Sequence, residues 1–327
     1  MFTVKREVRP YGRKYLRKKE IGLVGLTEEL VSQLQRDGRY RTARAYGSVL
    51  RSVLGFFNEE DLPMRLLSGE FLRRYEEYML LKGLRMNTVS FYMRNLRAIY
   101  NKGVQLGKVN PVSENLFAKV YTGIHITPKR SAREEDIAKV VGWLANQAEN
   151  PILPEARPLI FSSYYFLFCF YARGMSYVDM AYLKKTDIRE GRICYRRRKT
   201  GQLLELKLTP EIKSILSFFN KYVRDSIYLF PVVCRDGREQ LPYESGLRLQ
   251  NQRLKKLSEK IGLSTSLTTH VARHTWATIA KKENIPISVI SESLGHRSEK
   301  TTSIYLGSFD RQVLDRANRK VAYSIKK

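Results

Sequence analysis

Cysteine is scarce in this chain, with three residues in 327: Cys169, Cys194 and Cys234. They are widely separated and form no Cys-x-x-Cys pair, which argues against a disulfide framework and against a zinc site. Long apolar runs are missing too. The most apolar stretch, residues 158–172, has 15 residues, whereas a bilayer span needs about 20. Because residues 1–6 also lack the apolar core of a signal peptide, we expect a cytoplasmic protein with no membrane partner.

Acidic residues are few compared with basic ones. The chain has 32 Asp and Glu against 59 Lys and Arg, which gives a formal net charge of +27. A surplus of that size repels itself unless a polyanion is present, so nucleic acid is the expected partner; the alternative is a merely soluble basic protein. No cluster of Asp and Glu has metal-ligand spacing. We therefore expect neither a metal nor another cofactor.

The first 122 residues divide into an arm and a helical domain. Residues 1–20 hold eight Lys and Arg with little apolar periodicity, which is typical of a flexible arm that orders on a phosphate backbone or of a solvated tail. Residues 21–122 carry apolar residues at helical spacing, as at Val49, Val53 and Phe57. This pattern predicts a small helical bundle.

Arginines in this bundle and in a later hairpin are candidates for contacts with the DNA backbone. Taken singly, each arginine of the bundle is explained more simply by a solvated helix face. The candidates are Arg39, Arg41, Arg44, Arg94 and Arg97 in the bundle, and Arg196 and Arg198 in the hairpin.

A second domain is expected over residues 129–327, after a linker that contains Pro128. A capping box, Ser131-Ala132-Arg133-Glu134, marks the start of its first helix. Further on, apolar residues alternate on both sides of a Lys-Thr-Gly turn, which predicts a β-hairpin with Lys199 at its tip. The expected fold class is therefore mainly α with a small β-hairpin or sheet.

The residues best suited to chemistry gather near the C-terminus. His270, Arg273, His296 and Tyr305 lie within 36 residues of one another in sequence. Two imidazoles, a guanidinium and a phenol are the groups needed to attack a phosphodiester with a tyrosine oxygen. Covalent DNA chemistry is therefore the leading hypothesis.

The spacing of these residues predicts where they lie. Residues 269–280 fit a helix in which positions 270, 273 and 274 share a polar face. Positions 272, 276, 279 and 280 form the opposite, apolar stripe, so the polar face is expected to be free to meet an anion. Gly295 ends the next helix and leaves His296 just past that end. A short helix over residues 298–307 would carry Tyr305 in its last turn.

The run His270-x-x-Arg273, then Leu294-Gly295-His296, then Tyr305 resembles the signature of the tyrosine recombinases, the phage integrase family. The likeness extends over roughly residues 20–320. It implies a helical, SAM-like core-binding domain followed by a mixed α/β catalytic domain. It also implies a mobile-element enzyme that integrates, excises or inverts DNA as a homotetramer on paired sites in double-stranded DNA, without metal or ATP. Accessory DNA-bending proteins are a further class of partner for such an enzyme.

The resemblance also assigns roles. Tyr305 is the nucleophile that forms a 3′-phosphotyrosyl bond, and Lys199 protonates the departing 5′ oxygen. The competing cations of the hairpin are Arg196, Arg197 and Arg198, and the alternative is a hairpin that only binds phosphate. Because a phenol has a pKa of about 10, its proton must be drawn away as it attacks. His270 is expected to be the general base, or at least the group that orients the phosphate. Arg273 and His296 are expected to stabilise the charge on the non-bridging oxygens.

The sequence departs from the family pattern at one position. The usual segment is Gly-Leu-Arg-x-x-Glu, whose arginine grips the scissile phosphate, and here it reads Gly174-Met175-Ser176-Tyr177-Val178-Asp179. One explanation is that Ser176 caps the following helix, with Asp179 completing a capping box, while Arg173 supplies the missing charge. The other is that the chain has lost activity. We expect a working enzyme because the other five residues are retained.

Two alternative functions remain open. A type IB topoisomerase-like nicking-closing enzyme would share the chemistry and act as a monomer. A catalytically impaired relative would only bind DNA. An amphipathic helix over residues 310–323 bears on the choice between a recombinase and a monomeric topoisomerase-like enzyme. The family resemblance implies that this helix docks on a neighbouring protomer; the alternative is that it folds back on its own domain.

Overall fold

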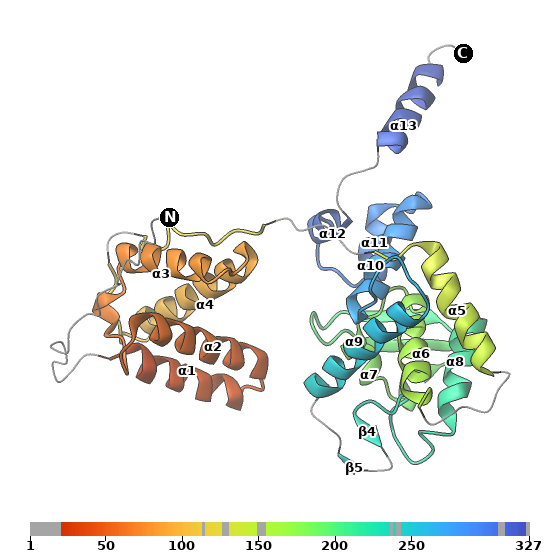
Figure 1. Ribbon diagram of the computed structural model, residues 1–327, viewed down its shortest axis with the longest axis horizontal. Helices are drawn as coiled ribbons and strands as arrows, with labels where there is room; N and C mark the ends of the chain where they lie inside the picture. Colours follow the sequence, from red (N-terminus) through yellow and green to blue (C-terminus); the bar gives the residue numbers. More distant parts are fainter. Residues whose placement is uncertain are drawn as a thin grey trace, which may run out of the picture. The chain divides into compact units, whose positions relative to one another are not determined.

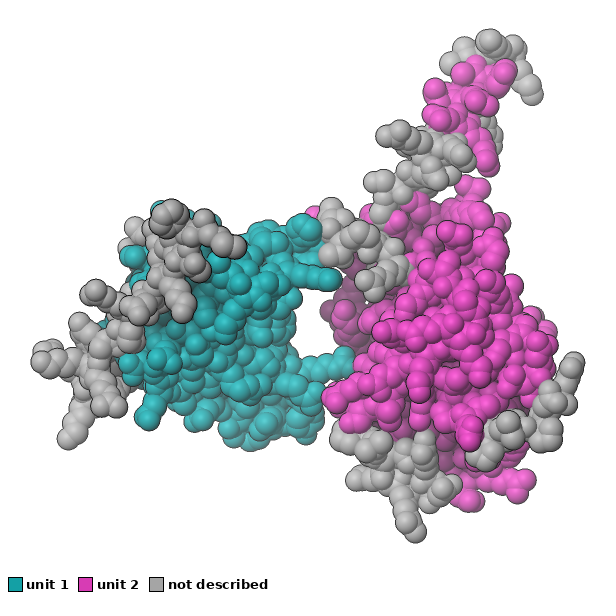
Figure 2. Space-filling model, viewed as in Figure 1, with its two compact units in different colours: residues 1–127 teal, residues 128–327 magenta. Residues whose placement is uncertain are grey.

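The computed structural model describes residues 21–112, 115–125, 131–148, 155–235, 238–239, 243–306 and 311–324. The expected arm, residues 1–20, lies outside them. The chain divides into two compact units, residues 1–127 and 128–327, which Figure 2 colours separately. Within the described residues, no helix combines the length and the apolar character that crossing a bilayer requires.

The first unit is a helical bundle, as the periodicity predicted (Figure 1). Val49, Val53 and Met93 have no exposed surface, because their spacing places them on the inner faces of their helices. Ser68 begins one helix by accepting a hydrogen bond from the amide of Phe71 at 3.2 Å, an N-cap that a serine favours. The elements are α1 (Leu23–Arg36), α2 (Tyr40–Phe57), the short 3-10 helix η1 (Met64–Leu66), α3 (Gly69–Leu81) and α4 (Met86–Gln105).

The second unit is built around one strongly apolar helix, α6. Tyr165 of α6 stacks on Phe219 of α8, and Phe168 of α6 meets the ring of Phe230 edge-on. These aromatic side chains form the centre of the larger core. The helices are α5 (Glu134–Ala148), α6 (Arg157–Tyr171), α7 (Tyr177–Ala181), η2 (Lys185–Asp187), α8 (Pro210–Asn220), α9 (Tyr243–Lys260), α10 (Thr269–Lys282), α11 (Ile287–Ser293), α12 (Glu299–Leu306) and α13 (Arg311–Ser324).

A three-stranded antiparallel sheet completes the second unit, in the order β1 (Ile188–Arg189), β2 (Arg192–Arg196), β3 (Leu203–Lys207). In the predicted hairpin Arg196 pairs with Leu203, so residues 197–202, with Lys199 among them, form the connection. A second, two-stranded sheet, β4 (Cys234–Arg235) with β5 (Arg238–Glu239), was not predicted. The prediction of a mainly α protein with a small sheet is confirmed.

Two local predictions for the second unit are wrong. The first helix does not begin at Ser131: α5 starts at Glu134, and it is the carboxylate of Asp136 that accepts a hydrogen bond from the amide of Arg133, at 3.3 Å. The same carboxylate also accepts hydrogen bonds from the amide and hydroxyl of Ser264. This long-range contact, invisible in the local sequence, fixes the helix start.

The second correction concerns α10. The prediction gave it one apolar stripe and one free polar face, but the structure buries Val271, Thr275 and Ala277 as well as Ala272. Arg273, on the predicted polar face, is only 6 % exposed. The reason is that α10 packs against α6, α9, α11 and α12, which enclose it on several sides.

Candidate active site

The structure builds a site around the buried guanidinium of Arg273. Its Nη1 donates to the carbonyl oxygen of Gly174 at 2.8 Å, and its Nη2 donates to that of Leu294 at 2.5 Å. The same Nη2 lies 3.1 Å from Nε2 of His296. Arg273 on α10 is thus held between the segment after α6 and the end of α11, in a fixed orientation.

His296 is positioned by the end of α11. The amide of Gly295 donates to the carbonyl of Glu292, and that of His296 to the carbonyl of Ser291, the pair of bonds that defines a Schellman motif. Gly295 has φ +62°, the left-handed conformation that this motif requires and glycine adopts without strain. The prediction that Gly295 ends the helix, with His296 just beyond, is confirmed.

Gly295 is also needed for close approach, because a Cβ there would lie 2.9 Å from Cδ1 of Leu204 and 3.0 Å from Cδ of Arg197. We expect Gly295→Ala to lower the free energy of unfolding by about 1–3 kcal/mol through backbone strain and overpacking, as measured by urea denaturation. Gly191→Ala is the matched control, since Gly191 has φ +72° but no atom within contact distance of such a Cβ. Equal losses in the two variants would contradict the packing argument.

The hydrogen bonds of His296 indicate its tautomer. A guanidinium can only donate, so Nε2 accepts from Arg273 and the ring proton sits on Nδ1, which lies 2.8 Å from the hydroxyl oxygen of Thr302. Desolvation, followed by the charges of Arg273, Arg197 and Lys199, lowers the pKa of His296 to about 4. The ring is therefore neutral at physiological pH in the free protein.

A pH dependence follows from this lowered pKa. An unfolded histidine has a pKa of about 6.5, so between pH 6.5 and pH 4 the unfolded chain takes up a proton that the folded chain refuses. As the pH is lowered from 6.5 to 4, we expect His296 to reduce the free energy of unfolding by about 1 kcal/mol per pH unit. Below pH 4 we expect no further loss from this residue. Denaturation curves at several pH values should show a weaker slope for His296→Asn than for the unchanged protein. Parallel slopes would contradict the assignment.

His270 and Lys199 belong to the same electrostatic neighbourhood. His270, on the first turn of α10, keeps an exposed surface, so its desolvation is incomplete. Desolvation and the charges of Arg273 and Lys199 nevertheless lower its pKa. Lys199, exposed in the hairpin connection, acts on both histidines. A neutral imidazole is the form that can accept a proton, which suits the role predicted for His270.

Ser176 takes the capping role that the sequence analysis offered as one explanation. It is the N-cap of α7, and its hydroxyl accepts from the amide of Asp179 at 3.4 Å. Asp179 does not complete the expected capping box. Its Oδ2 accepts from the Ser176 hydroxyl at 2.6 Å, while its Oδ1 accepts from the amide of Arg198 in the hairpin connection at 2.9 Å. The pair thus ties α7 to the hairpin.

Arg173 is not brought into this cluster. Its backbone has φ +56° where α6 ends, and its Nη1 donates to the carbonyl oxygen of Glu205 on β3 at 3.3 Å. It lines a pocket between β3 and α11 with Glu292 and Ser293. The charge predicted to replace the missing arginine is therefore directed toward another surface.

Tyr305 lies in α12, one residue before the last residue of that helix. This agrees with the short helix predicted over residues 298–307. The side chain of Tyr305 is outside the part of the chain that the structure describes, so its role as nucleophile stays a prediction. Thr302, on the same helix, contacts His296 and links α12 to the site.

The candidate DNA contacts are placed on the surface in most cases. Arg39, Arg41 and Arg44, near the start of α2, are exposed, and so is Arg94 of α4, whereas Arg97 is half-buried. Arg196 and Arg198 flank the buried Arg197 and are exposed. Their contacts with DNA stay predictions.

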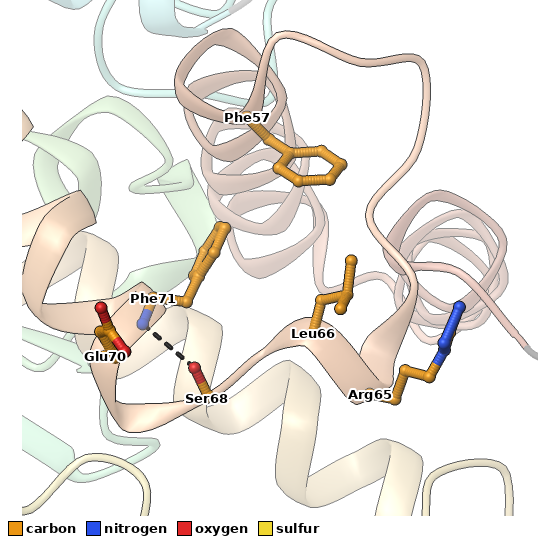
Figure 3. Close-up of a pocket in the computed structure, with 6 residues that line it drawn as sticks. All are labelled: Phe57, Arg65, Leu66, Ser68, Glu70 and Phe71. Carbon is orange, nitrogen blue, oxygen red and sulfur yellow. Dashed lines mark hydrogen bonds between the residues drawn. The ribbon is translucent and has the colours of Figure 1, made fainter. Parts of the chain in front are cut away.

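A pocket of the first unit carries none of these candidates. Figure 3 shows its lining, which is Phe57, Arg65, Leu66, Ser68, Glu70 and Phe71. The hydroxyl of Ser68 is engaged in capping α3, and Phe57, Leu66 and Phe71 line the pocket beside the charged Arg65 and Glu70. Among the described residues, no group of three or more His, Cys, Asp and Glu side chains is arranged to hold a metal ion.

Sequence reasoning missed two contributors to the site. Thr302 was not singled out, and nothing in its local pattern marks a hydroxyl that contacts an imidazole. Arg197 was treated only as one of several cations in the hairpin, yet its side chain is 7 % exposed. Strand alternation could have found it, because Ile193 and Tyr195 are buried on the same side of β2 and Arg197 continues that series.

Comparison with curated proteins reveals relatives of similar length. The tyrosine recombinase XerA of Pyrococcus furiosus is 26 % identical over 265 residues, covering 74 % of this chain and 90 % of the relative. The tyrosine recombinase XerC of Thermodesulfovibrio yellowstonii is 25 % identical over 287 residues, covering 84 % and 87 %.

Solved structures and family models agree with these relatives. The Tn1549 transposon integrase in complex with transposon right end DNA has a TM-score of 0.66 at 13 % identity, with 92 % of this chain and 100 % of that chain covered. A lambda integrase dimer bound to a core site has a TM-score of 0.62 at 16 % identity, with 89 % and 99 % covered. The phage integrase SAM-like domain matches residues 22–118, and the phage integrase family model matches residues 144–312. The chain therefore belongs to the phage integrase family, the tyrosine recombinases.

Proposed function

We propose that this protein is a site-specific DNA recombinase that cleaves and rejoins strands through a 3′-phosphotyrosyl bond on Tyr305. The observation that carries the proposal is the buried Arg273, fixed by two backbone carbonyls and paired with His296. A preorganised cation of this kind can stabilise an oxyanion without reorganising during the reaction. Family membership and the position of Tyr305 on the adjoining helix α12 support the same conclusion.

The chemistry divides among named groups. The phenolic oxygen of Tyr305 attacks the scissile phosphorus while His270 takes the phenol proton. As the bond from phosphorus to the 5′ oxygen breaks, Lys199 gives that oxygen a proton, and the strand leaves with a 5′ hydroxyl. Arg273 and His296 stabilise the added charge on the non-bridging oxygens. Reversal by a 5′ hydroxyl of another duplex restores the phosphodiester and frees Tyr305.

His296 needs a change of protonation to act as a donor. In the free protein its Nε2 accepts from Arg273, so it has no proton there to offer a phosphate. A bound phosphate would stabilise the imidazolium, since an adjacent anion raises the pKa of a histidine. The protonated Nε2 would then donate to the phosphate, while Arg273 keeps its hydrogen bonds to the two carbonyls. We therefore expect DNA binding to raise the pKa of His296 from its lowered value.

The partner in this proposal is double-stranded DNA, gripped by the basic surfaces of both units through the arginines named above. Lambda integrase, a structural neighbour, has been solved as a dimer on a core site and as a tetramer on a Holliday junction. We extend that mode of assembly to this chain, with α13 as the exchanged helix. Its exposed Val321 and Tyr323 give it apolar surface to bury on a neighbouring protomer.

A nicked suicide duplex tests the proposal. The crossover is first mapped in the host genome, and the duplex is then nicked just downstream of the cleavage position so that the short 5′-hydroxyl fragment diffuses away. We expect a covalent adduct that survives denaturation, is removed by protease and retains a label placed at the 5′ end of the cleaved strand. Transfer to a second duplex and DNA-dependent tetramers are expected of a recombinase, whereas a topoisomerase-like enzyme would act as a monomer. No adduct with wild-type protein would overturn the proposal.

A further inference from the structure

Arg197 is a buried cation at the edge of the candidate site. It follows the last residue of β2, where side chains alternate between the two faces of the sheet. Ile193 and Tyr195 point into the protein and are at most 8 % exposed, and Arg197 continues this series at 7 %. Its neighbours Arg196 and Arg198 are exposed, so only one of three consecutive arginines enters the interior.

The contacts of Arg197 place it beside Arg273. Its Nη1 donates to the carbonyl oxygen of Gly295, while Nη2 of Arg273 donates to the carbonyl oxygen of Leu294. Two guanidinium groups therefore rest on consecutive carbonyls of the turn that carries His296. The space that a Cβ on Gly295 would need is taken by Cδ of Arg197, at 3.0 Å, so the glycine is what allows this approach.

Among the residues that the structure describes, no carboxylate forms an ion pair with Arg197, and its buried Nε has no hydrogen-bond acceptor. Its charge contributes to the lowered pKa of His296, as expected of a cation close to that ring. Holding a buried donor unpaired next to a second cation costs stability. A phosphate in the site would accept a hydrogen bond from the unpaired donor and would neutralise the two neighbouring cations.

The Ser176 and Asp179 pair holds Arg197 in this place. Asp179, 3 % exposed, accepts the Ser176 hydroxyl on one oxygen and the amide of Arg198 on the other. Arg198 sends its own guanidinium over the ring of Tyr182, 3.9 Å from the centroid. The serine at the position of the family's arginine thus helps to anchor the loop that delivers Arg197.

We propose that Arg197 is a catalytic residue that contacts a non-bridging oxygen of the scissile phosphate and supplies the positive charge missing at position 176. This inference rests on the proposed function. Arg197 and Arg273 bind the two non-bridging oxygens from adjacent positions, and both contacts strengthen as charge accumulates in the pentacoordinate transition state. Ser176 and Asp179 are positioning residues for Arg197.

The test compares Arg197→Ala with Arg189→Ala, an exposed arginine on β1 of the same sheet, in single-turnover cleavage of the nicked duplex. Loss of one oxyanion donor lowers a rate by about 100- to 1000-fold, which we expect for Arg197→Ala alone. Each variant is also given a duplex with a methylphosphonate at the scissile position, where one charged oxygen is replaced by a neutral methyl group. Because little charge is then left to neutralise, the defect of Arg197→Ala should shrink to less than about tenfold.

The outcomes separate catalysis from structure. If the role of Arg197 were merely structural, Arg197→Ala would slow cleavage of the phosphodiester and methylphosphonate duplexes alike. A normal cleavage rate for Arg197→Ala would show that the residue is dispensable. Either result overturns the inference while the proposed function stands. Absence of adduct with wild-type protein overturns both. If Arg197→Ala does not fold, Arg197→Met keeps the volume without the charge and is expected to show the same selective rescue; thermal unfolding and DNA band-shift assays check both variants.

Discussion

Replacing Tyr305 with phenylalanine is expected to abolish covalent adduct formation while leaving DNA binding intact. The substitution removes one oxygen, the atom that would attack phosphorus, and keeps the ring that α12 carries. Removal of a catalytic nucleophile typically lowers the rate by about 10⁶-fold, which takes the adduct below detection on a denaturing gel. A band-shift assay should show unchanged affinity for the target duplex, since the phenol contributes little to binding the uncleaved strand.

The matched control for this prediction is Tyr323→Phe. Tyr323 lies on α13 and is 68 % exposed, and phenylalanine keeps the apolar ring that we propose packs on a neighbouring protomer. The same chemical change there should therefore leave the rate of adduct formation within about twofold of wild type. Adduct that persists in Tyr305→Phe would refute the assignment of the nucleophile. Phosphoamino-acid analysis of the protease-digested adduct would then identify the residue actually linked to DNA.

The sequence was sufficient to predict the elements of the site. The spacing of His270 and Arg273 predicted α10, and the glycine at position 295 predicted both the end of α11 and the place of His296. These are local effects, set by side-chain periodicity and by the left-handed conformation that glycine tolerates. They can be inferred without knowing what packs nearby.

Side-chain directions were harder to predict because they depend on distant partners. Arg173 was expected to enter the site, but a carbonyl of β3 holds its guanidinium elsewhere. Arg273 was expected on a free face, and instead it is enclosed where α6, α11 and α12 meet α10. Both outcomes arise from contacts between residues at least 20 positions apart in the chain, which helical periodicity does not encode.

The hairpin combines features that local sequence predicts with one side-chain direction that was missed. Its strands and the position of Lys199 follow from alternation and from the turn residues. The burial of Arg197 also follows from alternation, provided that the series through Tyr195 is continued past the end of the strand. The residue type argued against continuing the series to Arg197, since arginines are rarely buried without a partner. Arg197 is an exception because we propose that it binds a phosphate.

Replacing Arg273 with alanine is expected to lower both activity and stability. The cleavage rate should fall by about 1000-fold, the upper end for loss of an oxyanion donor, because Arg273 also orients His296 through its Nη2. The carbonyl oxygens of Gly174 and Leu294 would lose their donors in a buried setting. The free energy of unfolding should then fall by about 1–3 kcal/mol, as measured by urea denaturation. Arg273→Lys keeps the charge but cannot reach both carbonyls and His296 at once, so an intermediate loss of about 100-fold is expected.

Lys282→Ala supplies the control on the same helix. Lys282 donates to Glu134 at 2.6 Å, but its side chain is 70 % exposed, and a surface ion pair of this kind contributes at most about 1 kcal/mol. Its removal should leave the cleavage rate unchanged. Wild-type cleavage by Arg273→Ala would show that the buried guanidinium is a structural clamp between α6 and α11, and the phosphate would then have to be held by other cations. A phosphate-binding arginine should give a different pattern. Arg273→Ala should lower the cleavage rate by more than its loss of folding stability explains, and Arg273→Lys should cleave at a rate between those of Arg273→Ala and the wild type. The reason is that the charge and the geometry of the donors contribute separately.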